Sequence, residues 1–258
     1  MKLEYATLSF PGTREINEDS FAVKEQDKNL VLVVADGLGG HDKGEVASKL
    51  VAETIIEKVV FREDAGEKLI ETLREAQRCL IEKQKRENAV DAMKTTAVAL
   101  SLTNGKAYLA YVGDSRGYAF FKNGKYVRTI DHSVPQMLAL AGDIKEKDIR
   151  YHQDRSSLLR VFGSEWEKDA IEILEEIDVA KTKAFLLCSD GFWELITESQ
   201  MKWCLMWSKT PNEWLERMKK IIEKNGKGKE MDNYTAGAVF IKEGETDDRA
   251  KGQWRPPL

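Results

Sequence analysis

Short acidic sequences recur along the chain where an apolar run ends or where the chain turns. They are Asn17-Glu18-Asp19, Asp36-Gly37, Asp190-Gly191 and Asp232-Asn233. No single one of them is informative. Together they offer enough hard oxygen ligands to bind a pair of divalent cations. The sequence therefore indicates the chemistry of a two-metal hydrolase.

Asp36 and Asp190 share a sequence context. Each follows an apolar run, Val-Val-Ala before Asp36 and Leu-Leu-Cys-Ser before Asp190, and each precedes a glycine. A strand end is a rigid place for a ligand, and glycine lets a cation approach the backbone carbonyl. One such sequence alone is more simply an Asp-Gly turn, and Asp114, which also ends an apolar run, would alone be assigned to a turn. The metal-site interpretation therefore depends on the acidic sequences occurring together in one chain.

Arg14 lies four positions before Glu18. A guanidinium can bind two oxygens of one phosphate, which makes Arg14 a candidate phosphate ligand. An equally good explanation of Arg14 is that it only neutralises the neighbouring acids, because arginine–carboxylate pairs are frequent at protein surfaces.

Other nucleophiles and metals fit the sequence less well. No cysteine has an arginine six residues downstream, and no Gly-x-Ser-x-Gly sequence occurs. A cysteine-dependent phosphatase and a serine hydrolase are therefore disfavoured. His41, His132 and His152 are too scattered to form a zinc site, although each could act separately as an acid. Oxygen ligands favour Mg²⁺ or Mn²⁺.

Apolar patterning predicts the elements that carry these residues. We expect strands at 29–36, 95–102, 106–112, 117–121, 170–177, 184–189 and 235–242. We expect helices at 45–61, 67–85, 198–207 and 211–225, the last opened by Thr210 and Pro211. Turns at Asn104-Gly105, Asp114-Ser115 and Asn123-Gly124 predict that neighbouring strands are antiparallel. The inner face of the first helix should carry Val46, Leu50, Ile55 and Val59.

The weakly patterned region 131–169 is expected to lie over a site and is the candidate for a mobile flap. We expect residues 1–243 to form one domain and 244–258 to be a flexible tail. The glycine-rich segment 37–40 lacks the lysine of a phosphate-binding loop, so a close-approach turn is the better interpretation.

Composition narrows the class of protein. The 258 residues include 40 basic and 44 acidic side chains, for a net charge of -4. No basic excess is available to hold a polyanion, so a nucleic-acid partner is disfavoured. Three cysteines cannot all pair, which suits reduced thiols. The longest apolar run, residues 30–35, is far too short for a membrane span, and no signal region opens the chain. We expect a soluble, cytoplasmic protein.

In order and spacing, eight motifs resemble those of the metal-dependent protein serine/threonine phosphatases of type 2C, in their compact bacterial form. The resemblance covers about residues 14–241. The motifs occupy residues 14–19, 34–41, 44–48, 95–98, 112–116, 131–133, 187–191 and 232–235.

This resemblance implies an α+β fold, with a central antiparallel β-sandwich flanked by α-helices on both faces. It implies that Asp36 bridges two metals, Gly37 contributes its carbonyl, and Asp190 and Asp232 bind the first metal. It also implies that Glu18 and Asp19 hold metal-bound waters, that Asp114 with Asp190 forms a third metal site, and that Arg14 binds phosphate. Arg14, Asp36 and Asp190 are then the catalytic residues.

The implied activity is hydrolysis of phosphoserine and phosphothreonine in proteins by a metal-bridged hydroxide, with two or three Mn²⁺ or Mg²⁺ ions. The implied partners are phosphorylated proteins, including a serine/threonine kinase that the enzyme would counteract in bacterial signalling, and its substrates.

Two positions depart from the family pattern. Leu38 stands where animal members have a histidine, as an apolar residue does in bacterial members, which leaves metal-bound water or His132 as the proton donor. Lys94 stands where the family usually has glycine.

Two rival functions follow from the same residues. One is a catalytically silent module that binds a partner. The other is a two-metal nuclease or phosphodiesterase, which suits the acidic charge balance poorly.

Overall fold

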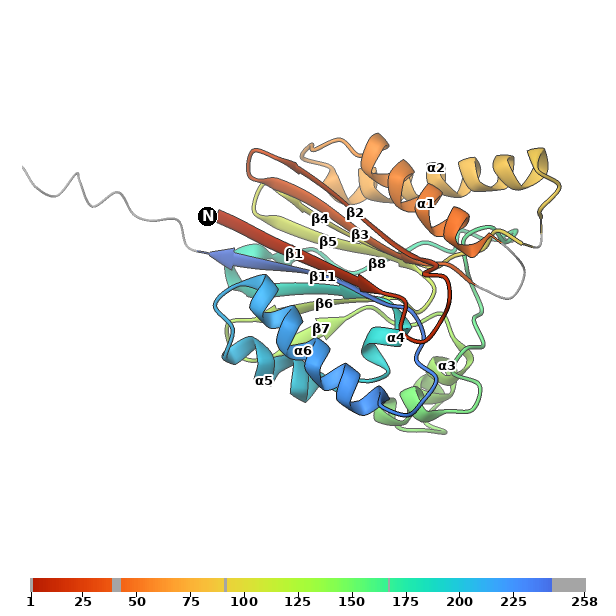
Figure 1. The fold of residues 1–258 in the computed structure, drawn as a ribbon. Helices are drawn as coiled ribbons and strands as arrows, with labels where there is room; N and C mark the ends of the chain where they lie inside the picture. Colours follow the sequence, from red (N-terminus) through yellow and green to blue (C-terminus); the bar gives the residue numbers. More distant parts are fainter. Residues whose placement is uncertain (1, 39–42, 91, 167, 243–258) are drawn as a thin grey trace, which may run out of the picture.

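Two antiparallel sheets pack face to face, and helices cover both outer faces (Figure 1). The computed structural model describes residues 2–38, 43–90, 92–166 and 168–242. This arrangement of two packed sheets and covering helices confirms the predicted α+β sandwich. The predicted tail at 244–258, with Gly39, Gly40 and His41, lies outside the described residues.

The first sheet has the strand order β1-β11-β10-β6-β7, and the second has the order β2-β3-β4-β5-β8. The first comprises β1 (Lys2–Phe10), β11 (Tyr234–Lys242), β10 (Thr182–Cys188), β6 (Arg116–Phe121) and β7 (Tyr126–Arg128). The second comprises β2 (Asp19–Gln26), β3 (Asn29–Asp36), β4 (Ala97–Thr103), β5 (Lys106–Val112) and β8 (Glu172–Ile173), with β9 (Ile177–Asp178) also pairing with β5.

The helices bury apolar faces against the outside of each sheet. One pair covers the second sheet and another pair covers the first, as Figure 1 shows. These pairs are α1 (Gly44–Lys58) with α2 (Ala65–Arg86), and α5 (Glu198–Met206) with α6 (Pro211–Gly226). The shorter helices are α3 (Val134–Ala141), η1 (Glu146–Tyr151), η2 (Val179–Lys181) and α4 (Asp190–Trp193). None of the helices among the described residues combines the length and the apolar character that crossing a bilayer requires.

Three apolar layers hold the sandwich together. The central layer lies between the sheets and includes Leu32, Val98 and Phe185. A second layer fills the space under α1 and α2, and a third, centred on Trp214, fills the space under α6. Strands covered on both faces need apolar residues on both faces, and this explains the unbroken apolar run in β3.

The structure corrects several predicted elements. The segment 170–177, expected to be one strand, instead carries the short strand β8 and the start of β9, and its three acidic residues limit its burial. Strands β1 and β2 were not predicted because each is the outer strand of its sheet and is only partly covered. On the first helix Ile55 and Val59 are buried as predicted, but Val46 and Leu50 are only half-buried, and Ala47 and Val51 are buried in their place. Small side chains face the sheet there because the helix packs closely.

The turn predicted at Asp114-Ser115 is a crossing between the two sheets. The hairpins at Asn104-Gly105 and Asn123-Gly124 join neighbouring strands as expected, but β5 and β6 belong to different sheets. Gly113 makes the crossing with a φ of 104° against the side chain of Thr96, where a Cβ would lie 2.5 Å from that side chain. The crossing carries Asp114 to the end of the sandwich.

Gly237 provides a test of the close packing between the sheets. A Cβ at this position in β11 would lie 2.6 Å from Leu32 in β3. Gly237→Val should therefore lower the free energy of unfolding by about 1–3 kcal/mol, because a filled core cannot accept the added volume. Urea denaturation measures the change. Lys183→Val, which puts the same residue at an exposed position of β10, should change stability by less than about 0.5 kcal/mol. Equal effects of the two substitutions would contradict this account.

Candidate active site

The acidic residues singled out in the sequence lie at one end of the sandwich. Asp19 begins β2 and is the register partner of Asp36, the last residue of β3. Asp190 follows β10, Asp232 precedes β11, and Asp114 lies in the crossing between the sheets. Because neighbouring strands are antiparallel, the end of one strand meets the beginning of the next. Topology therefore brings together carboxylates that are distant in the sequence.

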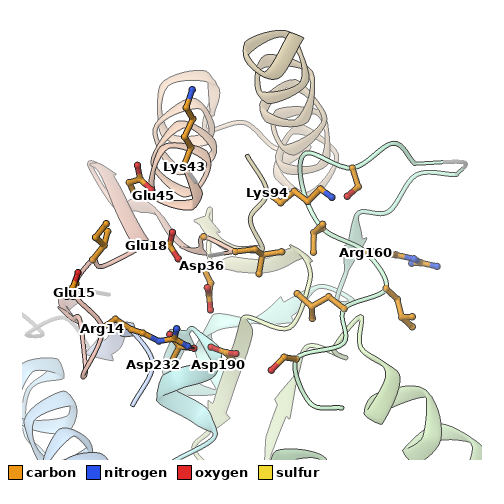
Figure 2. Close-up of a pocket in the computed structure, with 18 residues that line it drawn as sticks. Arg14, Glu15, Glu18, Asp36, Lys43, Glu45, Lys94, Arg160, Asp190 and Asp232 are labelled. Atoms are coloured by element: carbon orange, nitrogen blue, oxygen red, sulfur yellow. The ribbon is translucent and has the colours of Figure 1, made fainter. Parts of the chain in front are cut away.

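Asp36 and Asp190 form the floor of a cleft. In Figure 2 the Asp36 side chain points toward Asp190. Both residues are half-buried, open to the cleft on one side and surrounded by protein on the others. Burial raises the pKa of Asp36 well above its usual range, and the charge of Asp190 raises it further. Burial likewise raises the pKa of Asp190.

Asp19 and Asp114 lie beneath this floor. Asp19 is buried, and its Oδ2 accepts a hydrogen bond of 2.7 Å from the Ser189 hydroxyl. Burial raises the pKa of Asp19 to about 7, partly offset by that bond. Asp114 is also buried, and burial followed by the charge of Asp190 raises its pKa. The backbone carbonyl of Asp114 accepts a hydrogen bond from the Trp193 indole, which ties the crossing to α4.

Arg14 and Asp232 face each other at the side of the cleft. An Arg14 guanidinium nitrogen lies 3.0 Å from Asp232 Oδ2, and Figure 2 shows Arg14 reaching toward Asp232. The two side chains are 61% and 46% exposed, so this ion pair contributes at most about 1 kcal/mol. It is weak enough for either partner to exchange it for another ligand.

Glycines at the acidic sequences allow their backbones to approach. A Cβ on Gly191 would lie 2.1 Å from the carbonyl oxygen of Asn233, and one on Gly37 would lie 2.6 Å from that of Glu18. Gly12, with a φ of 62°, packs against the carbonyl of Asp232 in the same way. These contacts give the glycines a role that the sequence did not reveal, since any side chain there would push the acidic segments apart.

The cleft encloses about 1070 Å³ and is lined by all but two of the predicted site residues. Arg14, Glu18, Asp36, Gly37, Asp190 and Asp232 line it, whereas Asp19 and Asp114 are buried behind it. Leu38 and Lys94, the two departures from the family pattern, also line the cleft. Residues 156, 158–161 and 164 form the opposite wall, so part of the predicted flap borders the site.

His132 does not reach the cleft. It is buried, and its Nδ1 accepts a hydrogen bond from the Gly113 amide at 3.2 Å. Its ring stacks on Tyr111, with centroids 5.2 Å apart. Its other ring nitrogen, Nε2, lies 3.3 Å from Glu172 Oε1.

The donor set fits hard divalent cations. Several carboxylates face one another at the floor, and buried like charges of this kind require a cation or protons to balance them. Asp19 Oδ1 is buried without a hydrogen-bond partner. Within the described ranges, no three acidic, histidine or cysteine side chains are already arranged as a complete ligand set. The engagement of Asp232 with Arg14 is one physical reason, because a shared ligand would have to turn toward the cation.

Several residues that organise the site had no recognised signal in the sequence. The Asn233 side chain accepts from the Glu18 amide at 2.8 Å and donates to the carbonyls of Pro11 and Ile16. The Thr95 hydroxyl donates to the Asp36 carbonyl at 2.7 Å. These bonds join segments far apart in the sequence. They could have been suspected only from the Asp-Asn-x-Thr and Thr-Thr motifs themselves.

The chain is similar to known proteins in sequence and in fold. A family model described as protein phosphatase 2C matches residues 12–233. A serine/threonine phosphatase, stp, of Listeria innocua is 31% identical over 207 residues, which cover 78% of this chain and 81% of that protein. The crystal structure of the phosphatase Stp1 from Staphylococcus aureus covers 94% of this chain and 96% of its own, with a TM-score of 0.84 at 24% identity, and shows the shared fold.

A further solved structure contains metal. The catalytic domain of the serine/threonine protein phosphatase PstP, in complex with two manganese ions, covers 93% of this chain and 99% of its own. Its TM-score is 0.77 at 26% identity.

Crowding of the carboxylates predicts an unusual effect on stability. In chelator at pH 8, Asp36→Asn should raise the free energy of unfolding by about 1 kcal/mol or more, because it removes one of several mutually repelling charges. Denaturation in EDTA measures this. Asp143→Asn, at an exposed position, should change stability by less than about 0.5 kcal/mol. Added Mn²⁺ should raise the melting temperature of the unsubstituted protein more than that of Asp36→Asn. Lower stability of Asp36→Asn in EDTA would refute the repulsion argument.

Proposed function

The chain belongs to the type 2C family of protein serine/threonine phosphatases, and on this premise we propose that its acidic cleft removes phosphate from phosphoserine and phosphothreonine side chains of proteins. One observation carries the proposal. Carboxyl groups from both sheets meet at the floor of one cleft, and a weakly paired arginine stands beside them.

The residues that would hold divalent cations follow from their positions in the cleft. We assign Asp36, Asp190, Asp232 and the Gly37 carbonyl as direct ligands of Mn²⁺ or Mg²⁺. Oxygen-rich sites of this kind suit both ions. Glu18 and Asp19 would act through metal-held water, and Asp114 with Asp190 would offer a third position. The PstP catalytic domain with two manganese ions supports a count of at least two.

Bound cations would supply a water of lowered pKa as the nucleophile and would neutralise charge on the phosphate. The protein's own groups would bind and orient the substrate and hold the acidic segments. Arg14 would exchange its exposed bond to Asp232 for two oxygens of the phosphate and orient the ester for in-line attack. The buried Asp19–Ser189 pair and the Asn233 amide would keep the acidic segments in place.

The substrates would be phosphorylated proteins, and the enzyme would counteract a serine/threonine kinase. We place the flap at about 141–166 within a single phosphatase domain of residues 1–243. Leu158, Leu159 and Arg160 bring this segment to the cleft. It is therefore in a position to contact the protein part of a substrate.

Metal removal tests the proposal directly. Phosphate release from a phosphothreonine peptide should require Mn²⁺ or Mg²⁺, and EDTA should abolish it. Asp36→Asn should lower kcat at saturating Mn²⁺ at least about 100-fold, because lost metal ligation is at least as costly as a lost supporting contact. Turnover that persists in EDTA would reject the mechanism. A folded, inactive protein at saturating Mn²⁺ would favour the silent module, and faster cleavage of a diester than of a monoester would favour the phosphodiesterase.

Arg14 allows the phosphate-binding step to be tested separately. Arg14→Lys keeps the charge but loses the planar fork, and we expect kcat/KM for a phosphopeptide to fall about 10- to 100-fold. Arg217→Lys, at an exposed position of α6, should leave kcat/KM unchanged. Because Arg14 also contacts Asp232, Mn²⁺ affinity should be measured in parallel by calorimetry. A fall in kcat/KM explained wholly by weaker Mn²⁺ binding would remove Arg14 from phosphate binding.

A further inference from the structure

We propose that Lys94 selects phosphoprotein substrates that carry an acidic side chain close to the phosphorylated residue. The inference rests on the proposed function and adds a substrate class to it. The recognised chemistry is an anion beside the reacting phosphate, supplied by a carboxylate or by a second phosphate of the same peptide.

Four cationic side chains line the cleft, and three of them are already paired. The pairs are Arg14 with Asp232 at 3.0 Å, Lys43 with Glu87 at 2.7 Å, and Arg160 with Glu172 at 2.9 Å. Of the cleft cations in the part of the chain that the structure describes, Lys94 alone has an ammonium group without a hydrogen bond or an ion pair. A half-buried lysine on a cleft wall keeps its full capacity to bind an anion from outside.

The backbone of Lys94 is held firmly beside the floor of the cleft. Its carbonyl accepts the Leu38 amide at 3.0 Å. The next residue, Thr95, bonds to the Asp36 carbonyl on one side and to the Phe162 carbonyl on the other. Lys94 therefore sits between the end of β3 and the segment that forms the opposite wall. Only its side chain must become ordered when an anion binds, which limits the entropic cost.

The position of Lys94 suits a neighbouring residue of the substrate better than the phosphate itself. In Figure 2, Lys94 and Arg14 lie on opposite sides of Asp36. A phosphate bound beside Arg14 and Asp36 would leave Lys94 next to the flanking peptide. An extended peptide advances about 3.3 Å per residue. An acidic side chain about one to three residues from the phosphoresidue would therefore come within reach of the flexible lysine.

Other charges on the rim make this contact selective for position. Glu15 and Glu45 also line the cleft, and in Figure 2 they lie on the Arg14 side, away from Lys94. They would repel an acidic residue on that side of the phosphate, whereas Lys94 would attract one on the other. We therefore expect the preference on one side of the phosphoresidue only.

Kinetics on matched phosphothreonine peptides test the inference. The peptides differ only in having Glu, Gln or Lys at one of the three positions on either side, and a further peptide carries a second phosphate. For the unsubstituted enzyme, kcat/KM should be about 2- to 10-fold higher for Glu than for Gln at one position. Lys94→Met should equalise the two, and Lys94→Glu should favour the Lys peptide. Added salt should weaken the preference. The doubly phosphorylated peptide shows whether a phosphate serves as well as a carboxylate.

Controls separate recognition from catalysis. Turnover of an aryl phosphate, which has no flanking residues, should stay within about twofold in the Lys94 variants. Lys85→Met, which removes the same charge from an exposed position of α2, should keep the Glu preference, and Lys94→Arg should restore it. If the enzyme hydrolyses phosphopeptides but Lys94→Met retains the same Glu-to-Gln ratio, the inference is wrong and the proposed function stands. If no phosphopeptide is hydrolysed at saturating Mn²⁺, both are wrong.

Discussion

Repulsion among carboxylates crowded at one end of a β-sandwich is the constraint on which the rest of this structure depends. Burial raises the pKa of Asp19, Asp36 and Asp114, and the charge of Asp190 raises the pKa of each of them further. Such a cluster opposes folding. It persists because the three apolar layers and two sheets fix the strand ends independently of the acids. The packing of the apolar layers, away from the site, thus offsets the free-energy cost of crowding these carboxylates.

Backbone contacts convert this general stability into a particular arrangement of the acids. The crossing at Gly113 brings Asp114 from the second sheet to the first, and the close approach at Gly191 sets Asp190 against the segment that carries Asp232. The Asn233 side chain then joins the segment that carries Asp232 to the loop that bears Arg14. Each contact leaves no room for a side chain or requires a specific amide. A small substitution here should therefore disturb several of the acidic residues at once.

The sequence predicted the covered strands and the acids better than the connections between them. β3, β5, β10 and β11 carry apolar runs because they are covered by protein, and periodicity finds such runs. The outer strands β1 and β2 have mixed sequences and were missed, and the Asp114 turn was assigned within one sheet because a local pattern does not show which sheet the next strand joins. The acids were visible as motifs at strand ends. The contacts of Asn233 and Ser189 were not visible in the sequence, because they join residues 215 and 170 positions apart.

Arg14 and Asp232 show how cation binding and substrate binding become linked under the proposed function. The same carboxylate would serve the arginine in the free enzyme and a cation in the loaded one, and the ion pair is too exposed to hold it strongly. If Asp232 turned from Arg14 toward a bound cation, the guanidinium would lose its partner and would be free to bind phosphate. By thermodynamic reciprocity, a phosphate that occupies Arg14 leaves Asp232 free for the cation. Each ligand would then strengthen the binding of the other, and the site would favour the state that holds both.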